Sequence, residues 1–230
     1  MAEQIYKEWF VRMRFPGHEN TKFIKGIPEG WEVKKISDIC NIMSGGTPST
    51  KISEYWDGSI PFFTPKDVPD SFYCLSTIQN ITETGLRKCN SKLYPKNTIM
   101  LTARGTVGKI SLLNTAMAMN QSCFALSSSE FSNFYLFMLL RAQMEAFKKM
   151  ANGATFDSIV LRTFDMLKVV HPPKGLINQY ADITAPIFNE LSTLAETIEK
   201  LTESRNLLLP RLISGKLSVE KLSKTLQEAV

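Results

Sequence analysis

Several predicted loops combine small residues with one basic or amide side chain, and this composition suits contact with a nucleic acid. Small residues let the backbone approach phosphates closely. An Arg side chain pairs with guanine through two hydrogen bonds, an amide suits adenine, and a Lys more often neutralises a phosphate. The residues predicted to contact DNA on these grounds are Lys51, Thr64, Lys66, Arg104 and Gln121.

Each of these residues also has a structural interpretation. Arg104 ends a predicted strand and Gln121 lies in an Asn-Gln-Ser turn, so either side chain can instead tie its loop to a strand by a hydrogen bond. Thr64 and Lys66 form a polar tip after an aromatic strand, and Lys51 follows a Gly-Gly-Thr-Pro turn. For the two lysines the alternative is a solvated loop residue. The sequence leaves both interpretations open.

Catalytic chemistry is hard to build from this sequence. It has no GxxxxGK[ST] phosphate loop, no GxGxxG fingerprint between strand and helix, and no HExxH motif. His18 follows Pro-Gly and His171 precedes Pro-Pro, so neither is placed for proton transfer. Three acidic residues near Lys66 could resemble the metal-binding cluster of a metal-dependent nuclease: Asp57, Asp67 and Asp70. The sequence lacks a strand-borne carboxylate followed by Glu-x-Lys, so the chain is predicted to be non-catalytic.

Composition and charge limit the class of protein. The 230 residues are 43% hydrophobic and 21% charged, which is ordinary for a globular protein with a full core. No run of eighteen apolar residues and no signal peptide is present, so we expect a cytoplasmic protein. A net charge of +5 fits a nucleic-acid partner without requiring one. The four cysteines lack CxxC spacing, which predicts free buried thiols and no structural zinc.

The elements that must position the loops are mostly short strands. Residues 31–126 contain runs of β-branched and aromatic residues bounded by Gly, Pro, Asn and Ser: SIPFFT, TIMLTA, KISLL and SCFALS. An N-terminal amphipathic helix with Ile5, Trp9 and Met13 on one face precedes them and breaks at Pro16-Gly17.

Helical spacing dominates the second half of the chain. Residues 131–151 repeat apolar side chains at three and four, which predicts one helix that Ser129 or Ser132 caps and Gly153 ends. The chain then returns to loop and strand until Pro172-Pro173. The sequence therefore predicts an α+β fold: a mostly-β globular domain with a packed helix, followed by a long C-terminal coiled-coil-forming helix.

The C-terminal helix, predicted to begin at Lys174, carries a heptad seam that a single helix cannot bury. The seam repeats at alternating spacings of four and three: Tyr180, Thr184, Ile187, Leu191, Leu194, Ile198, Leu201, Arg205 and Leu208. We expect a second copy to pair antiparallel with its central part, formed by Ile187, Leu191, Leu194, Ile198 and Leu201. Pro186 must kink the helix or start a new one, and the tail after Pro210 predicts one more short helix.

A series of segments, taken in order, carries a family resemblance: GIPEGWEVKKISDI, SGGTPST, YWDGSIPFFTPKDV, LYPKNTIMLTARGTVGK, MNQSCFAL, NGATFDSIVLRTFDMLKVVHPP and RNLLLPRLISGKL. Together they resemble one target-recognition domain and its helical spacer from the DNA specificity subunit of Type I restriction–modification enzymes. The resemblance covers residues 27–217 and divides the chain into 1–26 (N-terminal helix and linker), 27–174 (recognition domain) and 175–230 (spacer, dimerisation helix and tail).

The resemblance implies a non-catalytic subunit that binds double-stranded DNA and docks methyltransferase subunits and an endonuclease/translocase subunit. S-adenosylmethionine, magnesium and ATP would belong to those partners, with no cofactor in this chain. The family's usual subunit carries two recognition domains and two spacers, so this chain resembles a half-subunit or the second half of one. Two alternatives remain: an inactive half-gene remnant, and a coiled-coil adaptor whose globular domain binds protein.

Overall fold

The computed structural model describes residues 1–152 and 158–216. Two compact units divide the chain, Met1–Leu191 and a second that begins at Ser192. The fold is mixed α and β with a long C-terminal helix, which confirms the predicted α+β class. The predicted end of the helix at Gly153 and the predicted short helix after residue 216 lie outside the described residues.

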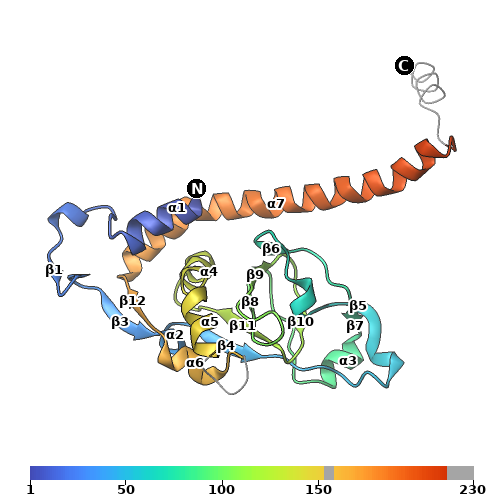
Figure 1. Cartoon of the computed structure of the whole chain (residues 1–230), viewed down its shortest axis with the longest axis horizontal. Coiled ribbons are helices and arrows are strands. Elements are labelled where there is room, and N and C mark those ends of the chain that lie inside the picture. Colours follow the sequence, from blue (N-terminus) through green and yellow to red (C-terminus); the bar gives the residue numbers. More distant parts are fainter. Residues whose placement is uncertain (153–157, 217–230) are drawn as a thin grey trace, which may run out of the picture. The chain divides into compact units, whose positions relative to one another are not determined.

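A five-stranded sheet forms the centre of the first unit, in the order β4-β11-β8-β9-β6 (Figure 1). Neighbouring strands are antiparallel except for the parallel pair of β6 and β9. Its strands are β4 (Asn41–Ser44), β6 (Tyr73–Cys74), β8 (Ile99–Thr102), β9 (Ile110–Leu113) and β11 (Cys123–Ser127). Every residue of β8 and β9 is buried, the polar Thr102 and Ser111 included, which explains why neither strand alternates between an apolar and a solvated face.

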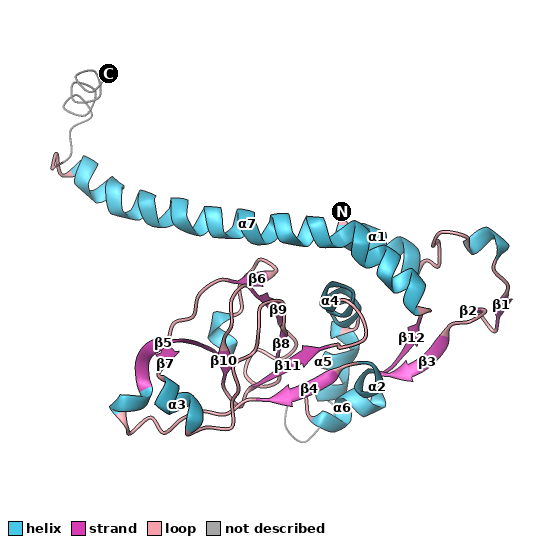
Figure 2. Ribbon diagram, turned by 180° about the vertical axis from the view of Figure 1, so that it is seen from behind, coloured by secondary structure: helices cyan, strands magenta, loops and turns pink. Residues whose placement is uncertain are grey.

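A smaller sheet lies at one end of the first unit, beside the short helix α3 (Glu83–Arg87). It consists of β10 (Ala118–Met119), β5 (Trp56–Phe63) and β7 (Asn80–Ile81). At the other end lie two two-stranded sheets, visible in Figures 1 and 2: β1 (Phe23–Ile24) with β2 (Ile27–Pro28), and β12 (Lys168–His171) with β3 (Glu32–Lys35). The four strands predicted from apolar runs are confirmed as β5, β8, β9 and β11.

The second half of the first unit differs from the sequence prediction in two places. The predicted single helix over 131–151 is two helices, α4 (Asn133–Ala142) and α5 (Met144–Asn152). The break lies at Gln143, the C-cap of α4, whose backbone (φ −94°, ψ 0°) departs from the helical conformation and whose N–H is shared between the carbonyls of Leu139 and Leu140. A further helix, α6 (Leu161–Met166), occupies a stretch predicted to be loop and strand. The short helix α2 (Ile36–Ile39) and three single-turn 3₁₀ segments complete the unit: His18–Asn20, Ser53–Tyr55 and Pro65–Asp67.

Of the two predicted N-cap residues of α4, Ser129 and Ser132, the structure uses Ser132. The Ser132 hydroxyl accepts a hydrogen bond from the N–H of Phe134 at 3.2 Å, so the Ser129 alternative is wrong. The first turn of α4 thus satisfies one of its free N–H donors locally. Seven consecutive residues of this helix, Phe134 to Leu140, are buried, as expected for a helix enclosed on all sides.

The N-terminal helix is part of the core of the first unit. It comprises α1 (Ala2–Tyr6) and a π-helical turn, Lys7–Val11. Its most buried side chains are Ala2, Tyr6 and Phe10, whereas the predicted face of Ile5, Trp9 and Met13 is only partly buried. The Phe10 ring lies 5.1 Å from that of Tyr135 in α4 and 5.3 Å from that of Tyr180. The predicted face is therefore shifted by one residue: Tyr6 and Phe10 are buried where Ile5 and Trp9 were expected.

The long helix α7 runs from Lys174 to Ile213 without interruption, so the predicted start at Lys174 is confirmed. The alternative of a new helix at Pro186 is wrong, because residues on both sides of this proline are helical. Thr184 lies beside it and donates its hydroxyl to the carbonyl of Tyr180 at 2.8 Å. Tyr180, Thr184 and Phe188 are fully buried, so the first four turns of α7 belong to the core of the first unit.

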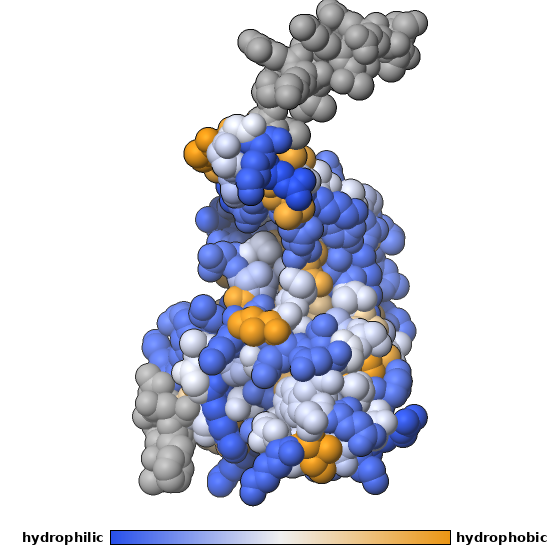
Figure 3. Space-filling view, turned by 90° about the vertical axis from the view of Figure 1, so that its right-hand side faces the viewer, coloured by the Kyte–Doolittle hydropathy of each residue, from blue (hydrophilic) through white to orange (hydrophobic). Residues whose placement is uncertain are grey.

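In the second unit the seam of α7 has no cover within the described part of the chain. Leu194, Ile198 and Leu201 are 49%, 64% and 64% exposed. The last two turns carry apolar side chains on every face: Leu207, Leu208, Leu209, Leu212 and Ile213. Figure 3 shows hydrophobic surface among hydrophilic surface at this end of the helix. A helical stretch that is apolar all round is normally buried, yet these side chains are exposed in the part of the chain that the structure describes.

Candidate nucleic-acid interface

The loops that carry the predicted DNA-contacting residues emerge at the same edge of the first unit. The register pairs Ser44 of β4 with Phe124, and Thr102 of β8 with Cys123, at the start of β11. In the smaller sheet Phe63, the last residue of β5, pairs with Met119, the last of β10. Because only residues 120–122 separate the end of β10 from the start of β11, one short turn joins the two sheets at this edge.

That turn, residues 120–122, holds its neighbours by backbone hydrogen bonds. The N–H of Asn120 donates to the carbonyl of Phe63 at 3.0 Å. The N–H groups of Ala103 and Arg104 donate to the carbonyl of Ser122, at 2.8 and 3.3 Å. The loops after β5 and after β8 are therefore fixed on one short turn, which also contains Gln121.

The Gly45-Gly46 pair brings the loop after β4 to the same place. The N–H of Gly46 donates to the carbonyl of Met119 at 3.2 Å. A Cβ on Gly45 would lie 2.3 Å from the carbonyl oxygen of Asn120, and one on Gly46 would lie 2.7 Å from the backbone nitrogen of Asn90. Both contacts are with backbone, so any larger residue would push the loop away from the turn.

Four of the five predicted residues present exposed side chains on these loops: Lys51, Lys66, Arg104 and Gln121. No ion pair engages Lys51, Lys66 or Arg104 within the described part of the chain. Gln121 is tied to the loop after β4, because the Thr47 hydroxyl donates to its side-chain oxygen. The segment that contains Thr47 stood out in the sequence, but nothing in it signalled that this residue fixes an amide from another loop.

Thr64 has a structural task in addition to any contact with DNA. It caps the 3₁₀ turn Pro65–Asp67: its hydroxyl donates to the Asp67 carboxylate at 2.6 Å and accepts from the N–H of Lys66 at 3.3 Å. The Asp67 carboxylate also accepts from the N–H groups of Thr64 and Ile78, at 2.7 and 2.8 Å. The hydrogen-bonding capacity of the Asp67 carboxylate is thus used within the loop. The exposed charged side chain of the 3₁₀ turn is that of Lys66.

The loop of Arg104 folds around the buried hydroxyl of Thr102, the last residue of β8. This hydroxyl accepts from the N–H of Lys109 at 2.9 Å and donates to the carbonyl of Thr106. The Thr106 hydroxyl reaches the carbonyl of Pro65 at 3.5 Å, which links the loop to the 3₁₀ turn. Lys109 is exposed on the same loop, and the sequence analysis did not select it.

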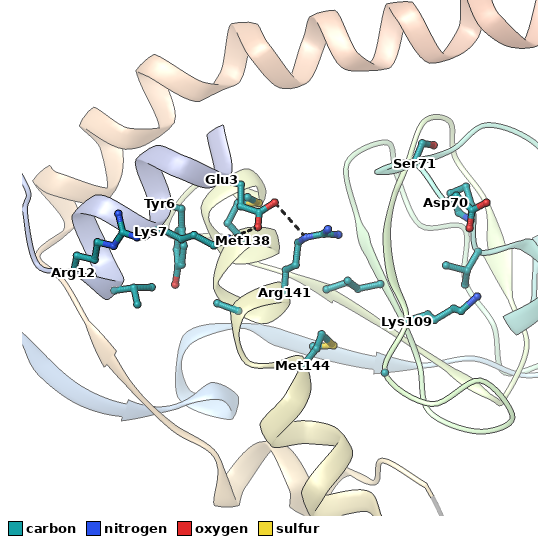
Figure 4. A pocket seen from close by; sticks show the side chains of 16 residues that line it. Glu3, Tyr6, Lys7, Arg12, Asp70, Ser71, Lys109, Met138, Arg141 and Met144 are labelled. Atoms are coloured by element: carbon teal, nitrogen blue, oxygen red, sulfur yellow. Dashed lines mark ion pairs between the residues drawn. The ribbon is translucent and has the colours of Figure 1, made fainter. Parts of the chain in front are cut away.

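A pocket of about 700 Å³ lies beside this loop (Figure 4). Gly108 and Lys109 form part of one wall, and none of the five predicted residues lines it. Several of its charges are paired internally: Glu3 lies 2.8 Å from Lys7 and 3.9 Å from Arg141, and the hydrogen bond from Lys7 lowers the pKa of Glu3. The pocket therefore lies next to the candidate interface without containing it.

The described residues offer little for acid–base or nucleophilic catalysis. No group of three His, Cys, Asp or Glu side chains in residues 1–152 and 158–216 is arranged to hold a metal ion. Burial raises the pKa of Cys40 and of Cys123 to about 12, which keeps both thiols protonated and unreactive. All four cysteines are free, as predicted, but only Cys74 and Cys123 are fully buried, so the predicted burial is wrong for Cys40 and Cys89, which are half-buried. His171 packs against the rings of Phe131 and Tyr135, and burial lowers its pKa.

Comparison with known proteins identifies the family. The family described as Type I restriction modification DNA specificity domain matches residues 28–203, and the chain belongs to it. The resemblance of the ordered segments is thereby confirmed. Within the described residues no helix is long and apolar enough to cross a membrane.

Two curated relatives are specificity subunits. The chain is 32% identical over 169 residues to the Type I restriction enzyme MjaIX specificity subunit of Methanocaldococcus jannaschii, covering 71% of this chain and 39% of the relative. It is 29% identical over 197 residues to the HindI specificity subunit of Haemophilus influenzae, covering 83% of this chain and 42% of the relative. The chain thus spans about two fifths of the length of these relatives.

Two solved structures share the fold. The HsdS subunit from Thermoanaerobacter tengcongensis matches with a TM-score of 0.52 and 19% identity, over 94% of this chain and half of that one (50%). The S subunit of a Type I restriction–modification system from M. genitalium matches with a TM-score of 0.59 and 16% identity, over 80% of this chain and 46% of that one. At these identities the likeness concerns the fold alone.

Proposed function

We propose that this chain is the sequence-specific DNA-recognition subunit of a Type I restriction–modification complex and reads one half-site with its globular unit. The observation that carries the proposal is the gathering of three loops, after β4, β5 and β8, at one edge of the unit, where backbone hydrogen bonds fix them to the turn 120–122 and to Met119 just before it. These loops present cations that form no ion pair with any described residue, together with one fixed amide, in a chain of the DNA specificity domain family.

The five predicted residues have different parts in this proposal. Arg104 is the candidate base reader, since its exposed guanidinium can pair with the O6 and N7 of guanine. Gln121, held by Thr47, offers its amide to a base edge. Lys51 and Lys66 neutralise phosphates, and Thr64 shapes the tip on which Lys66 lies.

We further propose that two copies pair antiparallel through α7. Leu194, Ile198 and Leu201, which are exposed in the single chain, support this pairing, with Leu191 (36% exposed) at its edge. Ile187 packs partly against the core of the first unit, so it should contribute less to the pairing of two copies than Leu194, Ile198 and Leu201 do. A two-fold pair presents two inverted recognition units, and the target is then a palindromic sequence with an unspecified gap.

The partners proposed for the complex are double-stranded DNA, the methyltransferase subunits and the endonuclease/translocase subunit. The chain itself is proposed to be non-catalytic, and S-adenosylmethionine, magnesium and ATP are assigned to those partners. The apolar end of α7, from Leu207 to Ile213, is the surface proposed for a methyltransferase subunit.

The test is co-expression of the chain with a cognate methyltransferase subunit, followed by mapping of methylated adenines over the genome. A palindromic gapped motif is the expected result. Arg104→Ala should relax the motif at one base and cost about 1–3 kcal/mol of binding if Arg104 reads a guanine. A loss of binding that is uniform over all sequences would instead make Arg104 a phosphate contact.

The length of the seam helix supplies a second test. Residues Ser192 to Ile213 of α7 extend about 33 Å at 1.5 Å per residue, close to the ~34 Å of one DNA turn. Insertion of four residues near Thr197 should therefore lengthen the gap between the half-sites. An unchanged gap in the methylation map would contradict the proposal that the length of α7 sets the distance between the half-sites.

Two other functions remain distinguishable from this proposal. An inactive remnant would fold and dimerise but support no methylation with any cognate methyltransferase. A coiled-coil adaptor whose globular unit binds protein would show no steep loss of binding with salt, because only DNA binding releases condensed counterions.

A further inference from the structure

A cationic segment beside the reading loops is assigned by neither the sequence motifs nor the relatives. It begins at the last residue of α3 and contains Arg87, Lys88 and Lys92, all exposed. No ion pair within residues 1–152 and 158–216 neutralises these three side chains. Three unpaired cations within six residues attract a polyanion, and the question is whether they lie where DNA would pass.

The backbone of this segment is fixed directly against the reading loops. The hydroxyl of Ser91 accepts from the N–H of Met119 at 2.9 Å, one residue before the turn 120–122. Tyr94 and Met117 exchange two backbone hydrogen bonds of 2.8 and 3.0 Å, and the Tyr94 hydroxyl donates to the carbonyl of Ser44 at 3.1 Å. Asn90 packs on Gly46 closely enough to exclude a Cβ there.

These contacts place the segment that carries the cations directly beside the reading loops. Ser91, between Lys88 and Lys92, touches the strand that leads into Gln121, and Asn90 touches the loop that leads to Lys51. On the other side, Gly85 of α3 packs against the carbonyl of Tyr55, in the 3₁₀ turn that follows Lys51. Together, α3 and the segment therefore contact the chain on both sides of Lys51.

A purely structural role accounts for part of this charge. Arg87 lies in the last turn of α3 and Lys88 is its C-cap, where cations favour the negative end of the helix dipole. Lys92 lies outside any helix and forms no ion pair with a carboxylate of the described residues, so the dipole does not explain it. A helix of only five residues also has a small dipole to neutralise.

We propose that the segment Arg87–Lys92 binds the phosphate backbone of the DNA whose bases the loops read, as a second, sequence-independent contact. The inference rests on the proposed function, since it needs DNA at the loops. It adds contacts that position the duplex without contributing to base choice. Lys88 and Lys92 should each neutralise about one phosphate.

The test is the salt dependence of binding to a fluorescein-labelled 30-base-pair duplex of mixed sequence, measured with the full chain. Lys88→Gln/Lys92→Gln should make the slope of log K against log salt shallower by about 1.8, because each phosphate that a lysine neutralises contributes ~0.9 to it. Between 50 and 200 mM salt the affinity advantage of the wild type over this variant should then shrink about tenfold.

The matched control is Lys22→Gln/Lys25→Gln, which removes the same two charges at the β1–β2 end of the unit, opposite α3 (Figures 1 and 2). This control should keep the wild-type slope, and Lys88→Arg/Lys92→Arg should keep it as well. An unchanged slope in Lys88→Gln/Lys92→Gln, or an equal change in the control, overturns the inference alone. A wild-type chain that does not bind the duplex overturns the proposed function together with it.

Discussion

Replacing Phe188 by Ala tests how the first turns of α7 are held to the globular unit. The ring is fully buried and stacks on that of Phe134 in α4, with centroids 4.5 Å apart and planes 1° from parallel. The rings of Phe72 and Phe137 lie 6.1 Å away on other sides. Removal of the ring leaves a cavity among rigid aromatic neighbours, which cannot collapse to fill it.

The expected loss is large for one residue. A buried Phe→Ala substitution costs about 3–5 kcal/mol of unfolding free energy. In a unit of this size each kcal/mol lowers the melting temperature by about 2–4 °C. Phe188→Ala should therefore lower Tm by about 6–20 °C, with Phe188→Leu intermediate. Thermal unfolding followed by circular dichroism at two protein concentrations measures it.

Leu201→Ala is the control for the same helix. Leu201 is 64% exposed in the single chain, so its truncation should change the stability of the globular unit by less than about 0.5 kcal/mol. If two copies pair through the seam, Leu201→Ala lowers Tm only at the higher concentration, because the dimer then adds stability by mass action. A Phe188→Ala protein that melts within about 2 °C of the wild type, less than 1 kcal/mol, would refute the anchoring of α7 by the aromatic stack.

Three further predictions concern the interface and the core. Gly46→Ala should cost about 1–3 kcal/mol and weaken duplex binding, because its Cβ would meet the backbone nitrogen of Asn90 at 2.7 Å; an undisturbed Tm and affinity would show that the loop moves freely. Thr47→Val should relax the methylated motif at the base read by Gln121 while Thr47→Ser keeps it, and identical motifs in sequencing of methylated DNA would contradict this. Burial and the nearby Lys34 lower the pKa of His171 below its usual 6.5, against the opposing effect of Glu32 and Glu130. The stability that the neutral ring contributes should thus be complete above pH 6.5 and fall as the pH drops from there through the lower pKa of the folded state, and His171→Gln should lose that part of the pH dependence in urea unfolding.

The sequence predicted elements well where one local signal decides them. Short apolar runs between turn residues predicted β5, β8, β9 and β11, because buried strands need little more than β-branched and aromatic side chains. It failed at Gln143, where the apolar spacing of three and four continues across the break between α4 and α5. Periodicity reports which face is buried, whereas the break depends on the backbone conformation of Gln143.

Pro186 shows a different limit. A proline removes one helical hydrogen bond, so the sequence predicted either a kink or the start of a new helix here, and the new helix is wrong. Tyr180 and Phe188, on either side of it, bury two large rings in the same core and keep the helix continuous. The free energy gained by burying these two rings exceeds the cost of the lost hydrogen bond at Pro186. A rule based on neighbouring residues alone does not include this tertiary burial.

For the candidate site, the sequence indicated which loops have suitable chemistry but not that they meet. Thr47 and Gln121 are separated by 74 positions along the chain, and they meet because β4 pairs with β11 and Gly46 bonds the carbonyl of Met119. The cationic segment from Arg87 to Lys92 escaped sequence-based prediction for the same reason. Its relevance comes from Ser91 and Tyr94, whose partners Met119 and Ser44 are known only from the fold.

The way in which the loops are fixed has a consequence for specificity. Asn120, Ala103, Arg104 and Gly46 hold the loops through backbone N–H groups, and their partners are backbone carbonyls. Such bonds do not depend on the side chains at Lys66 or Arg104, which are exposed to solvent. Those side chains can therefore change without loss of the scaffold, so that new base preferences arise at little cost in stability. Thr64 differs, because its hydroxyl belongs to the cap of the 3₁₀ turn, and a change there alters the shape of the tip as well as its chemistry.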